Sequence, residues 1–89
     1  MKISKTVRSM ISDEGAVLRD TKTGVTFGLN HIGAQIWNML EECIQAEEII
    51  DRISLEYDAP RAVVADDLRD LIQKLKDHAL VFPEGDPGQ

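Results

Sequence analysis

The stretch "TGVTFGLNHIGAQIW", residues 23–37, constrains the fold of this chain most, because its periodicity changes abruptly at Asn30. Before Asn30, apolar residues alternate with small or polar ones, as in a half-buried strand. The two faces would hold Val25, Phe27 and Leu29 on one side and Thr26 and Gly28 on the other. After Asn30, a favoured N-cap residue, apolar residues recur at helical spacing. The stretch therefore predicts a strand that leads directly into a capped helix.

Two earlier segments also have strand character. Residues 5–12 alternate loosely, and residues 16–20 follow a turn signal at 13–15. Residues 20–24 have the composition of a hairpin loop, in which Gly24 suits a positive φ. Three short strands joined by tight turns predict an antiparallel meander.

Three amphipathic helices are expected after the strands. The first spans 31–42, the second starts at 46 or 47 and ends at 57, and the third starts near Pro60. The apolar stripe of the third helix consists of Val64, Leu68, Leu71, Ile72 and Leu75. The order predicts an α+β fold, a winged helix-turn-helix with a three-stranded antiparallel sheet followed by three helices.

Length and composition limit the number of domains that the chain can form. The 89 residues suffice for one domain, which we assign to 1–82, and the Pro/Gly-rich tail 83–89 is expected to be disordered. No apolar run is long enough to span a membrane, and the first ten residues lack the apolar run of a secretory signal. Cys43 is the single cysteine, which fits a reducing compartment. We therefore expect a cytoplasmic protein.

The charge balance argues against nucleic acid and anionic membranes as partners. Sixteen acidic residues outnumber ten basic ones, which gives a net charge of −6. A protein that neutralises phosphates needs clustered Lys and Arg. A neutral or basic partner fits this composition better.

No pattern in the sequence points to catalysis. His31 and His78 are far apart, and no nucleophile motif accompanies either of them. The glycines match neither the dinucleotide fingerprint nor the phosphate-binding loop. Asp66, Asp67 and Asp70 suggest a metal at first sight, but a solvated acidic helix face explains them better. We expect no enzyme activity, no cofactor and no metal.

The sequence instead favours a function in binding through exposed surfaces. In a meander the third strand can lie at an edge, where its unpaired backbone groups are ready to accept an extended peptide. Gly28 would leave room for an approaching backbone, and a β-bulge or a tight packing contact explains it equally well. On the third helix, Val63, Asp67, Asp70 and Lys74 share a flank that either borders a groove beside the sheet or is an ordinary boundary.

The chain resembles the PqqD-like precursor-recognition elements of ribosomally made, post-translationally modified peptides. The resemblance is carried by "FGLNHIGAQIWNMLEE" and by "EEIIDRISLEYDAPRAVVADDLRDLIQKLKDHALV", and it covers roughly residues 5 to 82. The matching pairs are Leu29-Asn30, Gly33-Ala34, Ile36-Trp37, Glu48-Ile49, Tyr57-Asp58, Asp67-Leu68 and Leu80-Val81. Ala79 stands where many relatives have Gly. The chain is most similar to the stand-alone leader-binding subunit of lasso-peptide biosynthesis.

The resemblance implies a non-catalytic adaptor. Its partners would be the leader of a precursor peptide and a separate leader peptidase, with or without a macrocyclase. The leader would add as a strand to the third strand and pack against the third helix. The implied leader-binding residues are Val25, Thr26, Phe27, Gly28, Leu29, Val63, Asp67, Asp70, Leu71 and Lys74. Two alternatives stay open at this point: a peptide chaperone for a radical maturation enzyme, and a DNA-binding winged helix.

Overall fold

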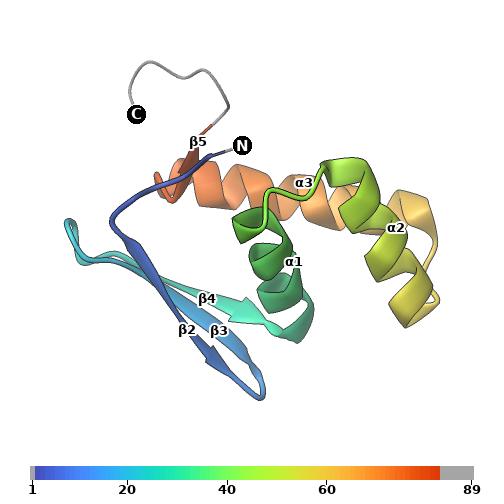
Figure 1. Ribbon diagram of the computed structural model, residues 1–89, viewed down its shortest axis with the longest axis horizontal. Coiled ribbons are helices and arrows are strands. Elements are labelled where there is room, and N and C mark those ends of the chain that lie inside the picture. Colours follow the sequence, from blue (N-terminus) through green and yellow to red (C-terminus); the bar gives the residue numbers. More distant parts are fainter. Residues whose placement is uncertain (1, 83–89) are drawn as a thin grey trace.

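The computed structural model describes residues 2–82, so the expected tail at 83–89 lies outside the described residues. The elements in chain order are β1 (Lys2–Ile3), β2 (Val7–Ser12), β3 (Gly15–Asp20), β4 (Thr26–Asn30), α1 (His31–Glu41), α2 (Ala46–Tyr57), α3 (Arg61–Asp77) and β5 (Val81–Phe82). The predicted order of three strands followed by three helices is confirmed (Figure 1).

The main sheet is an antiparallel meander with β4 at one edge. Its strand order is β2-β3-β4, and its registers run without interruption, with Met10 opposite Val17 and Val17 opposite Gly28. This regular pairing leaves no bulge at Gly28, and a Cβ placed there would meet nothing within 4 Å. Both structural alternatives for Gly28, a bulge and a tight contact, are therefore wrong.

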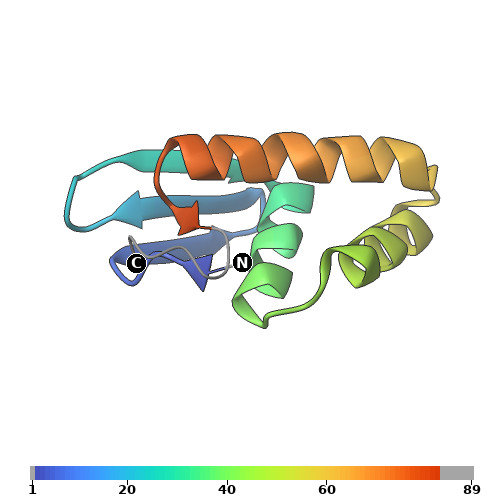
Figure 2. The same cartoon turned by 90° about the horizontal axis from the view of Figure 1, so that it is seen from above.

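The helices α1 and α3 lie on one face of this sheet, α2 packs on α3 beyond the end of the sheet, and the core lies between these elements (Figures 1 and 2). The largest fully buried side chains are Trp37, Leu18, Ile49, Leu75, Leu80 and Val81. Because they come from different parts of the chain, the core joins the sheet, all three helices and the C-terminal strand. The Trp37 indole N–H has no hydrogen-bond partner among the described residues.

Helix ends follow local chemistry. The Asn30 side chain accepts a hydrogen bond of 2.8 Å from the Gly33 backbone N–H, which confirms the predicted N-cap of α1. The helix α2 ends where Asp58 adopts a left-handed conformation with a φ of 51°. Pro60 then occupies the N-cap position of α3, one residue earlier than its predicted place in the first turn.

Some predicted details differ from the structure. Helical spacing predicts one apolar stripe of Ile32, Ile36, Met39 and Leu40, with Trp37 beside it, and another of Ile49, Ile50, Ile53 and Tyr57. Ile32 and Tyr57 are nevertheless 37% and 36% exposed, whereas Trp37 is central to the core. The two-residue strands β1 and β5 pair with each other in a second, antiparallel sheet that the sequence pattern did not predict. This pairing brings the two ends of the described chain together.

Substitution by Ala should have different effects on stability at two glycines of the sheet. Gly15 has a φ of 155°, and a Cβ there would lie 2.0 Å from the Leu29 carbonyl oxygen, so backbone must shift. We expect Gly15→Ala to lower the free energy of unfolding by about 2 kcal/mol or more. Gly28→Ala should be neutral or stabilising by up to about 1 kcal/mol, because Ala restricts the unfolded chain and meets no neighbour in the fold.

Urea unfolding followed by the fluorescence of Trp37, the single tryptophan, measures both variants. Equal losses for the two variants would contradict this account of the sheet.

Candidate functional site

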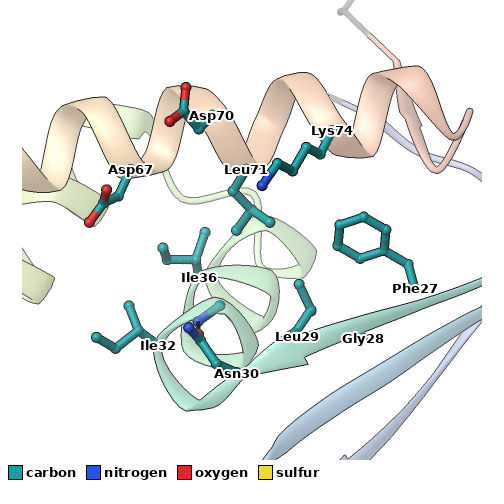
Figure 3. Close-up of a pocket in the computed structure, with 11 residues that line it drawn as sticks. Phe27, Gly28, Leu29, Asn30, Ile32, Ile36, Asp67, Asp70, Leu71 and Lys74 are labelled. Carbon is teal, nitrogen blue, oxygen red and sulfur yellow. Dashed lines mark hydrogen bonds between the residues drawn. The ribbon is translucent and has the colours of Figure 1, made fainter.

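A groove lies between β4, the first turns of α1, and α3 (Figure 3). It has a volume of about 390 Å³. Its walls are formed by Phe27, Gly28, Leu29, Asn30, Ile32, Gly33, Ile36, Asp67, Asp70, Leu71 and Lys74. The groove exists because α3 packs on α2 and β5 but makes few contacts with β4.

The groove brings together most of the residues singled out from the sequence. Phe27, Gly28, Leu29, Asp67, Asp70, Leu71 and Lys74 line it. Val25, Thr26 and Val63 do not line it. Val25 precedes β4, Thr26 is exposed at its start, and Val63 is 51% exposed in the first turn of α3.

Sequence reasoning missed four lining residues: Asn30, Ile32, Gly33 and Ile36. Asn30 ends β4, and Ile32, Gly33 and Ile36 lie in the first two turns of α1. A helix that starts at the end of an edge strand places residues of these turns beside that edge. The exposure of Ile32 has its explanation here, because this side chain faces the groove rather than the core (Figure 3).

The free edge of β4 presents an alternating set of backbone groups. Asp20 donates its N–H to the Val25 carbonyl over 2.9 Å, which marks this pair as hydrogen-bonded. In an antiparallel ladder such pairs alternate, so Phe27 directs its N–H and C=O toward β3. Thr26 and Gly28 consequently direct theirs away from the sheet. The edge thus offers two donors and two acceptors at the spacing that another strand requires.

The middle of the groove is apolar. Leu29 and Ile36 are buried at its base, Leu71 of α3 is half-buried above them, and Ile32 extends the apolar surface toward the start of α1 (Figure 3). Aliphatic side chains from three elements therefore converge beside the open strand edge. An extended peptide paired with β4 would bury every second side chain against them.

Charged residues of α3 differ between the two ends of the groove. Asp67 and Asp70 lie toward the end with Ile32, and Lys74 lies toward the end with Phe27 (Figure 3). Asp67 and Lys74 are two helical turns apart, a distance of about 10 Å along the helix axis. An extended chain covers that distance in about three residues. The Phe27 ring packs edge-on against the His78 ring, with 5.1 Å between centroids, beyond the Lys74 end.

The loop before β4 is fixed by the carboxylate of Asp20. This buried side chain accepts hydrogen bonds from the Thr6 hydroxyl at 2.8 Å, the Lys22 N–H at 2.9 Å and the Thr23 N–H at 3.4 Å. The Thr6 hydroxyl, and next the Lys22 backbone, hold the pKa of the Asp20 carboxyl below its ordinary value. Asp20 thereby ties the turn after β3 to the segment before β2 and positions the start of β4.

Within residues 2–82, no group of three or more His, Cys, Asp and Glu side chains is arranged to hold a metal ion. Among these residues, none of the helices has both the length and the apolar composition that crossing a membrane requires.

The fold and groove define a small winged helix-turn-helix protein with an open strand edge beside its last helix. Residues 15–81 match the family described as coenzyme PQQ synthesis protein D (PqqD), and the chain belongs to this family. No curated protein sequence matches the chain.

Two solved structures share this fold. The first is described as TbiB1 in complex with the TbiA(beta) leader peptide; it is 44% identical, with a TM-score of 0.85 and 96% of each chain covered. The second is described as lasso peptide synthetase B1 complexed with the leader peptide, and it is 23% identical with a TM-score of 0.84. That match covers 92% of this chain and 96% of the other, and at this identity it supports the fold alone.

The role of Asp20 predicts a specific pH dependence. Because the folded-state pKa is lowered, the stabilisation is complete above the unfolded value of about 4 and is lost as the pH falls through the folded value. Asp20→Asn keeps a hydrogen-bond acceptor but removes the charge. We therefore expect the free energy of unfolding to fall less between about pH 4 and pH 2 in this variant than in the wild type.

Urea titrations at several pH values measure this difference. Asp13→Asn makes the same chemical change at the tip of the other hairpin and is the matched control. Identical pH profiles for Asp20→Asn and the wild type would contradict the assignment.

Proposed function

We propose that this protein is a non-catalytic adaptor that binds the leader region of a ribosomally synthesised precursor peptide. The leader adds as a strand to β4, packs its alternate side chains against α3, and is presented to a separate leader peptidase and macrocyclase of the lasso-peptide type. The observation that carries the proposal is the open edge of β4, whose Thr26 and Gly28 backbone groups face outward beside an apolar groove.

The comparisons support the choice of ligand. A protein 44% identical over 96% of its chain is described in complex with a leader peptide. The groove matches what such a ligand needs, since ladder hydrogen bonds supply affinity and the apolar pocket residues fix the register. A chaperone for a radical maturation enzyme would use the same groove, and the family description, coenzyme PQQ synthesis protein D, favours it as the second candidate. The genes beside this one distinguish the two.

The third candidate, a DNA-binding winged helix, fits the charge distribution poorly. The helix that would enter the groove of DNA carries Asp66, Asp67, Asp70 and Asp77, which offset its Arg and Lys residues. Binding to DNA depends on clustered basic side chains. Salt-sensitive binding to duplex DNA at low ionic strength would revive this candidate.

The direct test is a titration of the labelled protein with the leader peptide encoded next to its gene. We expect backbone amide shifts to change mainly at residues 24–30 and on the groove side of residues 63–74. Changes confined to other parts of the protein would exclude the proposed site.

A proline at the open edge should separate binding from folding. Gly28→Pro removes an N–H that the sheet itself does not use, so the domain should remain folded. Loss of one ladder hydrogen bond, about 1 kcal/mol net, together with the bulk of the ring should raise the Kd of the leader about tenfold or more. Thr26→Pro should act in the same direction for the same reason.

Gly28→Ala is the matched control, because it adds a side chain but keeps the N–H. Calorimetric titration should give it the wild-type Kd within about threefold. A folded Gly28→Pro variant with wild-type affinity would rule out strand addition.

The charges of the groove should act mainly on the association rate. With a net charge of −6 and two aspartates at the groove, the protein suits a leader that carries Lys or Arg. Replacing Asp67 and Asp70 by Asn should slow association about threefold at low salt and reduce its salt dependence, with a smaller effect on dissociation. Stopped-flow measurements over a salt series report both rates.

The control for this pair is Asp13→Asn combined with Glu14→Gln, which removes the same charge at a hairpin tip away from the groove. If the two double substitutions slow association of the leader equally, the net charge of the protein rather than the charge at the groove determines the association rate.

A further inference from the structure

The outer face of the main sheet, which points away from the helices, has an unusual composition for this acidic chain (Figure 1). Strand alternation assigns to it Arg8, Met10 and Ser12 of β2, Val17 and Arg19 of β3, and Thr26 and Gly28 of β4. None of these side chains is acidic, although acidic residues outnumber basic ones sixteen to ten in the whole chain. We call these seven residues the outer sheet face.

Two arginines of the outer sheet face lie directly opposite each other. Arg8 and Arg19 are register partners, and like charges in this arrangement destabilise a sheet. Arg8 donates to the backbone carbonyls of Lys5 and Val7, each at 3.2 Å. Arg19 has neither an ion pair nor a side-chain hydrogen bond within the described part of the chain. The repulsion between Arg8 and Arg19 is therefore not offset by an acidic side chain of the described residues.

The arginines of the helices, in contrast, form ion pairs with acidic side chains. Arg52 pairs with Glu48, Arg61 with Glu47, and Arg69 with Asp66. Carboxylates are abundant on this protein, so their absence around Arg8 and Arg19 leaves two cationic groups available for a carboxylate from outside.

Exposed apolar side chains adjoin the two arginines. Met10 is 74% exposed and Val17 is 46% exposed, and they lie opposite each other in the same sheet. Gly28 continues this row on β4 and leaves open space above it. Arg and Met beside a shallow apolar surface are typical of protein–protein interfaces. A nucleic acid would gain only two cations here and nothing from Met10 and Val17.

We propose that the outer sheet face is the docking surface for a second protein that presents carboxylates beside an apolar patch. The inference rests on the proposed function, and the partner is the leader peptidase that receives the bound peptide. The groove lies at the β4 edge on the helical side of the sheet, whereas the side chains that carry the docking surface, Arg8, Met10, Val17 and Arg19, lie on the opposite side and do not line the groove. Both surfaces are therefore accessible at the same time, as an adaptor that presents a peptide to an enzyme requires.

The test uses Arg19→Glu and the leader peptidase encoded with this chain. The introduced carboxylate would face Arg8 and form an opposite-charge pair across the strands, so the melting temperature should stay equal or rise. The Kd of the leader should stay unchanged, because Arg19 does not line the groove. The Kd of the peptidase should rise more than tenfold, and removal of the leader should slow accordingly.

Lys76→Glu provides the matched control, with the same charge change at an exposed position of α3 that does not line the groove. It should bind leader and peptidase like the wild type. Met10→Thr tests the apolar part of the surface independently of charge and should also weaken the binding of the peptidase. The melting temperature of each variant shows that it is folded.

The measurements distinguish failure of the docking surface from failure of the proposed function. Wild-type affinity of Arg19→Glu for the peptidase would overturn the docking surface, and so would an equal loss in Lys76→Glu. Salt-sensitive binding of a DNA duplex that Arg19→Glu abolishes, with peptidase binding intact, would overturn it in favour of nucleic acid. Failure of the wild type to bind the leader would instead refute the proposed function, which a calorimetric titration without peptidase detects separately.

Discussion

The hydrogen bond between the Asn30 side chain and the Gly33 backbone fixes the geometry on which the groove depends. Asn30 is the last residue of β4 and the N-cap of α1, so the strand edge and the first helical turn meet at one residue. A Cβ on Gly33 would lie 3.3 Å from both the Asn30 Oδ1 and a Leu29 methyl group. A small residue at this position therefore allows the close junction, and the junction brings Ile32 and Ile36 beside β4.

An unprotected strand edge is a hazard for aggregation, and this protein limits the hazard with a neighbouring helix and its charged residues rather than with residues of the strand itself. Edge strands are usually blunted by Lys, Pro or a bulge, and β4 contains none of these. Instead α3 runs along the β4 side of the sheet (Figure 2), and Asp67, Asp70 and Lys74 border the approach to the edge. Because α3 lies beside this edge, a single extended strand approaching it would meet fewer atoms of the helix than a whole sheet would. The same arrangement that admits a ligand strand thus opposes sheet-to-sheet association.

The sequence predicted those features that local chemistry determines. The alternation in β4, the Asn30 cap and the three helices follow from spacing and residue type, and so does the placement of Asp67, Asp70 and Lys74 on one flank. The pairing of β1 with β5 could not be predicted, because two-residue strands have no periodicity and form only when distant parts of the chain meet. The environments of Trp37 and Ile32 could not be predicted for a related reason. Trp37, expected at the edge of the buried stripe, lies in the core, whereas Ile32, expected in the stripe, lines the groove. A helical stripe shows which residues share a face, but the tertiary packing of α1 decides which of them reach the core and which reach the groove.

The charge distribution separates the two surfaces of the protein in a way that the net charge conceals. A value of −6 suggests one uniformly acidic surface, yet the acidic residues concentrate on the helices and the hairpin tip, and the sheet between them carries Arg8 and Arg19. Asp67 and Asp70 of α3 border the groove on the helical side of the sheet, whereas Arg8 and Arg19 lie on the outer sheet face, so the two sides favour partners of opposite charge. A basic peptide is therefore drawn to the groove and repelled from the outer sheet face, while an acidic protein surface experiences the reverse. In the proposed adaptor, a leader in the groove and a peptidase on the outer sheet face would occupy different sides of one sheet and would not compete for the same surface.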